Sequence, residues 1–173
     1  MGNFQITSVE DGKKYWISRS MATRSEVIVH DGEYHYILIN KRGIGAPDFQ
    51  GCWNIPCGYL EYDVTCKENA TKELLEENKV YIHPDMWNLV MIEDSPKRNK
   101  QNVTAVMQVN ISMEMFKVAC KCGSEMNCDG GEVDEVDSVK LLLLNEDNIN
   151  SIEWAFNHKN RAMEILNLFK NGN

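Results

Sequence analysis

The chain has 173 residues, and its 26 acidic against 18 basic side chains give a formal net charge of −8. The length suits one domain with a substantial core, and the acidity argues against broad, non-specific binding to nucleic acid. No apolar run approaches the roughly 18 residues that a membrane span needs, and the first twenty residues do not form a signal peptide. We therefore expect a single cytoplasmic domain over residues 1–173 that does not associate with membranes.

The first part of the chain is typical of β-strands. Residues 27–30 and 34–39 are rich in β-branched and aromatic side chains, and they flank an Asp-Gly pair that is typical of a hairpin turn. Residues 15–18 are a candidate short strand before this hairpin. Residues 41–52 contain three glycines and a proline, which indicates a loop.

A helix follows this loop region. Thr65 and Glu68 form a capping-box pattern, and apolar residues such as Ala70 and Leu74 then recur at helical spacing. The pattern predicts a helix that begins at Thr65 and ends near Asn78, because the next residues are β-rich and precede a proline.

The second half of the chain adds strands and a final helix. We expect strands over residues 86–92, 103–112 and 136–144, with residues 113–130 helical at first and then a loop. Apolar residues at positions i, i+3, i+4 and i+7 predict a C-terminal amphipathic helix; they are Ala162, Ile165, Leu166 and Phe169. This order of elements predicts an α/β (α+β) fold in which helices cover both faces of a mixed sheet.

Three glutamates fall on one face of the predicted helix at 65–78. Glu73 lies three and four residues before Glu76 and Glu77, so their like charges repel on a helix surface. One interpretation is a solvated acidic face that Lys72 and Lys79 partly compensate. The other is a divalent-cation site, because hard carboxylate oxygens suit Mg²⁺ or Mn²⁺.

The segment from Gly58 to Val80 resembles the signature of the Nudix hydrolases. That signature is G-x5-E-x7-R-E-U-x-E-E-x-G-U, where U is a bulky aliphatic residue. The chain matches it at Gly58, Glu73, Leu74, Glu76, Glu77 and Val80. The similarity extends over roughly residues 15–168, including the acidic segment 131–136 and the Ala-Phe-Asn-His sequence at 155–158.

The resemblance implies a Nudix-like α/β/α sandwich and an acid anhydride hydrolase. Its substrate would be a nucleoside diphosphate linked to another group, as in a nucleoside triphosphate, a nucleotide sugar or ADP-ribose. The metal-binding role carries over onto Gly58, Glu73, Glu76 and Glu77, with Mg²⁺ or Mn²⁺ as the cofactor. Members of the family frequently form homodimers, so a homodimer is one state that the resemblance allows.

Further site residues are expected outside the three glutamates. Glu132 and Glu135 are candidates for the general base or an extra metal ligand, the alternative being a solvated acidic loop. The candidates for substrate binding are the cations Arg19, Arg42 and Lys72 and the aromatic Tyr59, whose alternative role is packing in the core.

The chain departs from the signature at three positions. Val64 replaces the first glutamate, Lys72 the arginine and Lys79 the last glycine. Lys72 keeps the charge but loses the bidentate fork of arginine, and Lys79 must make a helix-terminal turn that favours glycine. These departures leave open a second reading, a Nudix-fold module that binds a nucleotide without cleaving it.

A third reading concerns the cysteines. Cys120, Cys122 and Cys128 have a spacing that a zinc-stabilised interaction domain can use, although no second ligand pair follows them. The alternative is that they are reduced thiols in a loop.

Overall fold

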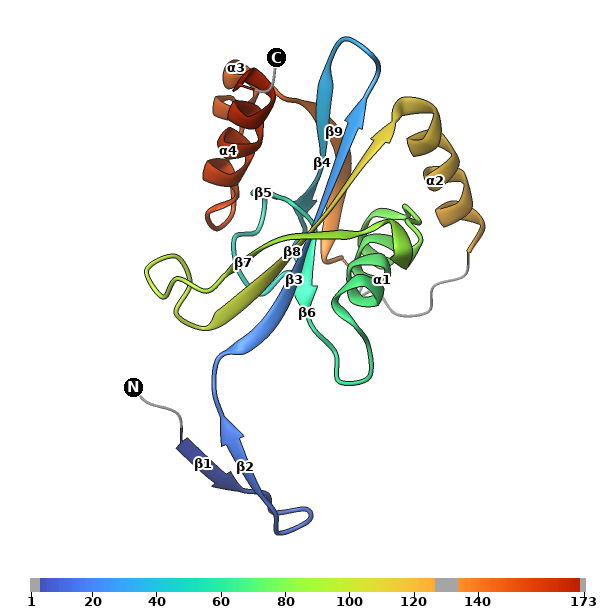
Figure 1. Ribbon diagram of the computed structural model, residues 1–173. Coiled ribbons are helices and arrows are strands. Elements are labelled where there is room, and N and C mark those ends of the chain that lie inside the picture. The colour runs from blue at the N-terminus through green and yellow to red at the C-terminus, as the bar shows by residue number, and fades with distance from the viewer. Residues whose placement is uncertain (1–3, 127–133, 172–173) are drawn as a thin grey trace.

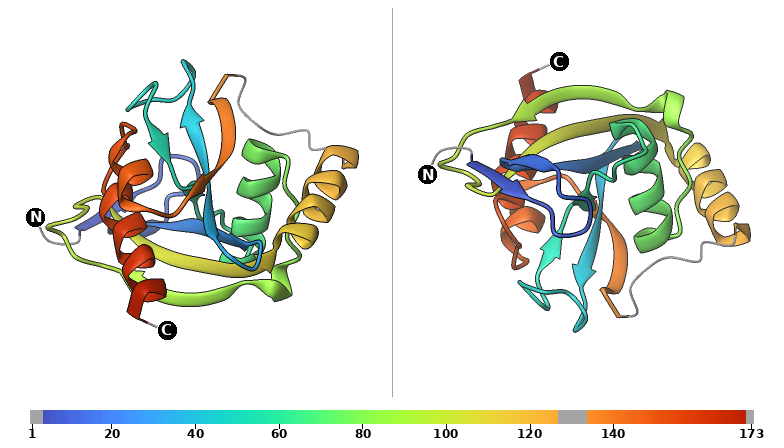
Figure 2. Two further views of the ribbon diagram at one scale, coloured as in Figure 1. Left: turned by 90° about the horizontal axis from the view of Figure 1, so that it is seen from above. Right: turned by 90° about the horizontal axis from the view of Figure 1, so that it is seen from below.

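The computed structural model describes residues 4–126 and 134–171, and within them a mixed sheet lies between two layers of helices (Figure 1, Figure 2). Nine strands are described: β1 Phe4–Thr7, β2 Lys14–Ile17, β3 Ser20–His30, β4 His35–Arg42, β5 Trp53–Asn54, β6 Cys57–Tyr59, β7 Asn88–Glu93, β8 Asn102–Ser112 and β9 Val136–Leu143. The helices are α1 Cys66–Asn78, the 3-10 turn η1 Pro84–Met86, α2 Met113–Glu125, α3 Glu146–Asn150 and α4 His158–Asn171. None of the described helices is long and apolar enough to cross a membrane.

The sheet is built around the long strand β3. It pairs in parallel with β8 along its whole length and antiparallel with β4 and β6. Strand β7 extends the sheet beyond β8, while β5 and β9 both pair with β4. The hairpin β1–β2 forms a separate two-stranded sheet that projects from the sandwich, and all of its strand residues are exposed (Figure 1).

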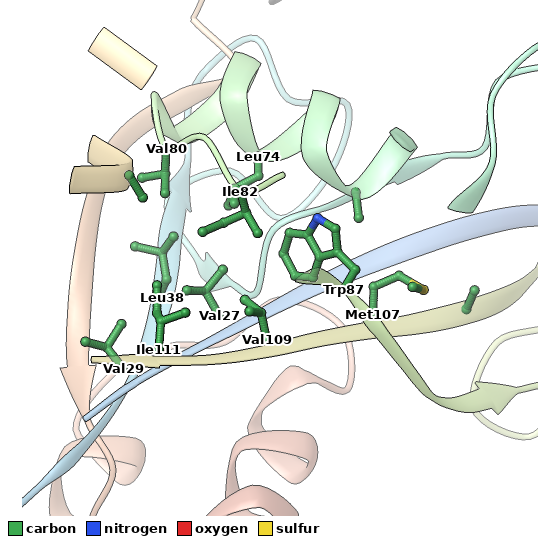
Figure 3. Packing of buried hydrophobic residues seen from close by; sticks show 13 residues of the cluster. Val27, Val29, Leu38, Leu74, Val80, Ile82, Trp87, Met107, Val109 and Ile111 are labelled. Atoms are coloured by element: carbon green, nitrogen blue, oxygen red, sulfur yellow. The ribbon is translucent and has the colours of Figure 1, made fainter. Parts of the chain in front are cut away.

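Two apolar clusters hold the layers together because β3 and β8 alternate their side chains between the two faces. On one face, Leu74 of α1 packs with Val27, Val109 and the fully buried Trp87 (Figure 3). The indole nitrogen of Trp87 donates to the hydroxyl of Thr71 at 2.9 Å, which satisfies its polar atom in the core. Helix α2 closes the outer side of the same layer (Figure 2).

The other face carries α3 and α4. Ile165 of α4 packs against Ile28 and Ile37 of the sheet. Arg161 of α4 also binds the sheet through polar contacts, because it donates to both carboxylate oxygens of Glu26 in β3 at 2.7 and 2.8 Å. Glu26 is fully buried, so this bidentate pair supplies the charge partner that its burial requires.

Most of the elements expected from the sequence are present in the structure. The hairpin between β3 and β4, the β8 strand and the helices at 66–78 and 158–171 are confirmed. The β-rich residues 80–82 form no strand; Val80 and Ile82 are buried in the core under α1, and the N–H of Tyr81 donates to the carbonyl of Ala119 in α2. Helix α2 extends further than we expected, while β1 and α3 were not predicted at all.

Candidate active site

A cleft of about 880 Å³ is lined by β6, by one end of the glutamate face of α1 and by neighbouring strands of the sheet. Most of the predicted site residues line it, and they come from four separate parts of the chain: Arg42, Gly58, Tyr59, Glu73, Glu76, Glu77 and Glu135. Arg19 and Lys72 are not among the residues that line the cleft. Glu132 lies outside the described residues.

Helix α1 places the three glutamates at the cleft, and its start is fixed by a complete capping box. The Thr65 hydroxyl accepts a hydrogen bond from the backbone N–H of Glu68, and the Glu68 carboxylate accepts one from the backbone N–H of Thr65. The buried residues Ala70 and Leu74 orient the helix against the sheet. Glu73 therefore faces strand β6.

The carboxylate of Glu73 sits directly against the backbone of Gly58. A Cβ added at position 58 would lie 2.1 Å from Cδ of Glu73 and 2.3 Å from both of its oxygens. A side chain at position 58 would occupy the place of the Glu73 carboxylate. Glycine is required here for this space and not for its backbone freedom, because the φ angle of Gly58 is not positive. The glycine that opens the signature thus makes space for the glutamate fifteen residues later.

Two of these carboxylates carry strongly raised pKa values. Burial raises the pKa of Glu73 to about 7, with repulsion from Glu76 and Glu135 acting in the same direction. Burial and the charge of Glu73 together raise the pKa of Glu77 to about 8. A bound cation stabilises the charged form of carboxylates that are desolvated and repel one another.

Asn40 of β4 holds Glu77 in place. Its Nδ2 donates to Oε2 of Glu77 at 2.8 Å, and this hydrogen bond lowers the pKa of Glu77 against the effect of burial. Asn40 is 1% exposed, so its amide is fixed in the wall of the cleft. Sequence reasoning missed this residue, because the contact joins positions 37 residues apart.

Lys72 and Lys79 show how the chain accommodates its departures from the signature. Nζ of Lys72 lies 2.6 Å from a Glu61 oxygen and 3.5 Å from a Glu76 oxygen, so it pairs with two carboxylates that line the cleft. Lys79 ends α1 in a left-handed conformation with φ 54°, and its N–H donates to the carbonyl of Leu75. The glycine-like turn is therefore made by a residue with a side chain.

Arg19 and Arg42 have different surroundings. The guanidinium of Arg19 donates to the backbone carbonyls of Asp94, Asn99 and Asn102, which ties down the loop between β7 and β8. Arg42 lines the cleft, where it donates to Asp48 at 2.7 Å. The structure therefore brings Arg42, but not Arg19, to the carboxylates of α1.

Glu135 and Tyr59 reach the cleft through the sheet. The N–H of Gly43, at the end of β4, donates to the carbonyl of Glu135 at 2.7 Å, which places the acidic segment beside the site. Tyr59 of β6 is 53% exposed, so it is not a core residue. Cys57 beside it is not available as a nucleophile, because burial raises the pKa of its thiol to about 12.

The residues at α1 fit a hard divalent cation by charge and atom type. Glu73, Glu76 and Glu77 supply carboxylate oxygens, the ligands that Mg²⁺ and Mn²⁺ prefer. In the arrangement described, no three His, Cys, Asp or Glu side chains of residues 4–126 and 134–171 stand close enough together to hold an ion. Cys128 lies outside the described residues, so the zinc interpretation remains a prediction.

The chain resembles known proteins in its fold. No family model matches the chain, and no curated protein matches it. Among solved structures, the NUDIX domain of NrtR from Shewanella oneidensis, determined with ADP ribose, has a TM-score of 0.63 at 14% identity over 86% of this chain and 87% of that one. The chain has the Nudix fold. The resemblance read from Gly58 to Val80 and the expected sandwich are thus confirmed at the level of the fold.

Two further structures support the same assignment. A MutT/nudix family protein from Enterococcus faecalis has a TM-score of 0.62 at 16% identity, over 90% of this chain and 62% of that chain. A bifunctional NMN adenylyltransferase/ADP ribose pyrophosphatase from Francisella tularensis, complexed with AMP and a manganese ion, also gives 0.62, at 19% identity. This chain is covered to 90% in that match but spans only 42% of the bifunctional protein.

Proposed function

We propose that this chain is a divalent-metal-dependent hydrolase that cleaves a phosphoanhydride in a nucleoside diphosphate linked to another group. The observation that carries the proposal is the pair Glu73 and Glu77, both desolvated in one cleft of a Nudix fold, with Glu73 seated on Gly58. Structures with this fold have been determined with ADP ribose and with AMP and manganese, which supports a nucleotide as the ligand.

Each side chain of the cleft would have a separate role in such a reaction. Glu73, Glu76 and Glu77 would hold Mg²⁺ or Mn²⁺, which supplies neutralisation of phosphate oxygens and activation of the attacking water. Asn40 fixes Glu77 through its 2.8 Å hydrogen bond, and Lys72 offsets the charge of Glu76. Of the two candidates for the general base, Glu135 is the one within the described residues, and it lines the same cleft.

The first test is turnover of a substrate panel. Nucleoside triphosphates, nucleotide sugars and ADP-ribose are incubated with Mg²⁺ or Mn²⁺, and release of diphosphate or of a phosphomonoester is followed by coupled assays. We expect metal-dependent turnover that the double variant Glu76→Gln, Glu77→Gln lowers by about 100-fold or more, since several kcal/mol of transition-state stabilisation would be lost. The variant Glu125→Gln on α2, outside the cleft lining, is the matched control.

The second candidate function is a module that binds a nucleotide without cleaving it. It is favoured by Val64, which stands where the signature has a glutamate, and by Lys72, which lacks the fork of arginine. Thermal stabilisation by one of the same ligands, without turnover under either metal, would support this function and contradict the hydrolase.

A further inference from the structure

The cleft continues beyond the carboxylates of α1 onto a part of the sheet that the proposed reaction does not use. Strands β3, β7 and β8 line it there, next to Tyr59 of β6. We call Arg24, Tyr59, Glu93 and Asn102 together the Arg24 subsite. One continuous cleft is lined both by this subsite and by Glu73. A ligand bound at the carboxylates can therefore extend over the sheet.

Arg24 has a guanidinium nitrogen without a partner in this subsite. The side chain is 3% exposed, its Nε donates to Glu26 at 3.1 Å, and its Nη1 donates to Glu93 at 2.8 Å. Nη2 is buried and makes no hydrogen bond within the described residues. A buried donor left unpaired costs about 1–3 kcal/mol, so the position favours an acceptor from outside the protein.

Asn102 offers the complementary group. Its Oδ1 is buried in the same subsite and accepts no hydrogen bond from the described residues. Neighbouring parallel strands carry Arg24 and Asn102, with Ala22 opposite Thr104 between them in the register. The subsite thus presents one unpaired donor and one unpaired acceptor on one sheet face.

The charges around Arg24 argue against a phosphate at this position. Three arginines and three glutamates form a connected network in which Arg24 and Arg161 pair with Glu26, Arg24 and Arg98 pair with Glu93, and Arg98 and Arg161 pair with Glu164. The formal charges of this network cancel. Nη2 therefore has no surplus charge behind it for an anion, and a neutral acceptor such as a carbonyl oxygen or a ring nitrogen suits it better.

Tyr59 adds an aromatic surface at the same place. It pairs with Ala22 across β6 and β3, half of its surface is exposed, and its hydroxyl accepts from Nε2 of Gln101 at 3.2 Å. A flat heterocycle gains from stacking on such a ring. Hydrogen bonds to one edge and an aromatic face nearby are what a nucleobase site requires.

We propose that the Arg24 subsite binds the base of the nucleotide. Arg24 Nη2 donates to a ring nitrogen or carbonyl oxygen of the base, and Asn102 Oδ1, whose residue pairs with Ser20 four residues along β3 from Arg24, accepts from another N–H or O–H of the nucleoside. The assignment rests on the proposed function for its choice of ligand class, and it makes Arg24 the residue that distinguishes a nucleotide from a base-free phosphate ester.

The test measures binding rather than turnover. Calorimetric affinities are determined for AMP, GMP, CMP, UMP and the base-free ribose 5-phosphate, under one set of conditions with Mg²⁺. We expect at least one nucleotide to bind tenfold or more tightly than ribose 5-phosphate. Arg24→Lys, which keeps the charge and loses the forked donors, is expected to reduce this preference by about tenfold and to leave the affinity for ribose 5-phosphate unchanged.

Arg161→Lys is the matched control, because it makes the same chemical change in the same ion network outside the cleft lining. It should keep the preference for the nucleotide, and thermal melting reports whether either variant is unfolded. Equal binding of nucleotides and ribose 5-phosphate in the unaltered protein would overturn the inference. So would an equal loss for both ligand types in Arg24→Lys, which indicates a phosphate site, or an equal loss of preference in Arg161→Lys.

The two proposals fail separately. A preference for a nucleotide that depends on Arg24, without any turnover, supports the base subsite while contradicting the hydrolase. Metal-dependent turnover without such a preference supports the hydrolase and contradicts the subsite.

Discussion

At the scale of single residues, the contact between Gly58 and Glu73 connects the signature to the geometry of the cleft. The glycine carries no side chain into the space that the carboxylate occupies, and its φ angle is one that alanine also adopts. Any effect of a methyl group at this position must therefore act through Glu73 rather than through backbone strain.

We predict that Gly58→Ala lowers the free energy of unfolding by at most about 1 kcal/mol, because the atoms that the methyl group meets are the far end of the flexible Glu73 side chain, which borders the cleft. In a Glu73→Ala background the same substitution should cost much less, because the atoms it meets are gone. Urea denaturation of the four proteins of this double-mutant cycle measures the difference. Equal costs in both backgrounds would show that Gly58 serves another purpose.

The sequence predicted part of the site at this scale. The sequence identified Glu73, Glu76 and Glu77 because residues three and four positions apart lie on the same face of a helix. It did not identify Asn40 and Glu93, because they contact Glu77 and Arg24 at sequence separations of 37 and 69 residues, which no local pattern encodes. A signal did exist for Arg24, since charged residues at 24 and 26 adjoin an apolar strand whose burial demands partners.

At the scale of secondary structure, helix α1 ends in an unusual way. Lys79 takes the left-handed conformation that glycine has in the signature, and its backbone carbonyl lies where a side chain at Gly123 of α2 would collide with it, at 2.2 Å. The exit of α1 and the close packing of α2 are therefore coupled.

We predict that Lys79→Gly is more stable than Lys79→Ala by about 1 kcal/mol, since alanine keeps the cost of the left-handed conformation and glycine does not. Comparing these two variants, rather than either with the unaltered protein, removes the contribution of the lysine side chain from the measurement. Thermal or chemical unfolding gives the difference. A glycine variant no more stable than the alanine variant would mean that α1 relaxes into another ending.

The elements that local patterns predicted are those with unambiguous local chemistry. The capping box at Thr65, the Asp-Gly turn and the alternation along β8 each favour one structure. Residues 80–82 have β propensity but form no strand, because burial of Val80 and Ile82 under α1 determines their conformation. The hairpin partner of β2 was missed since its strand residues have no buried face to produce a pattern.

At the scale of the whole molecule, α4 is fixed to the sheet by polar groups as well as by its apolar face. Nδ1 of His158 accepts a hydrogen bond from the backbone N–H of Ile55 at 3.0 Å, and the imidazole is 5% exposed. Burial lowers the pKa of His158 well below its usual 6.5, and the charges of Arg24 and Arg42 add to that effect.

This gives a pH dependence with a definite sign. The neutral imidazole is favoured in the folded protein, so its contribution to stability is complete above pH 6.5 and is lost as the pH falls toward the folded pKa, at up to about 1.4 kcal/mol per pH unit. We predict that His158→Asn, which can still accept the N–H of Ile55, removes this loss between pH 6.5 and 5.5. Urea denaturation at both pH values measures it, with the exposed His30→Asn as the control for loss of one histidine. An unchanged pH dependence in His158→Asn would contradict the prediction.

The parallel pairing of β3 with β8 also determines when the protein can fold. These strands form the centre of the sheet, yet partners such as Glu26 and Gln108 are 82 residues apart, and α4 reaches Glu26 across 135 residues. Such pairings close long loops and form slowly. During synthesis the hairpin of β3 and β4 leaves the ribosome long before β8, so its apolar faces and one strand edge stay uncovered until residue 112 has emerged. During this interval the nascent chain can associate wrongly with other chains through these uncovered surfaces, which the finished fold buries.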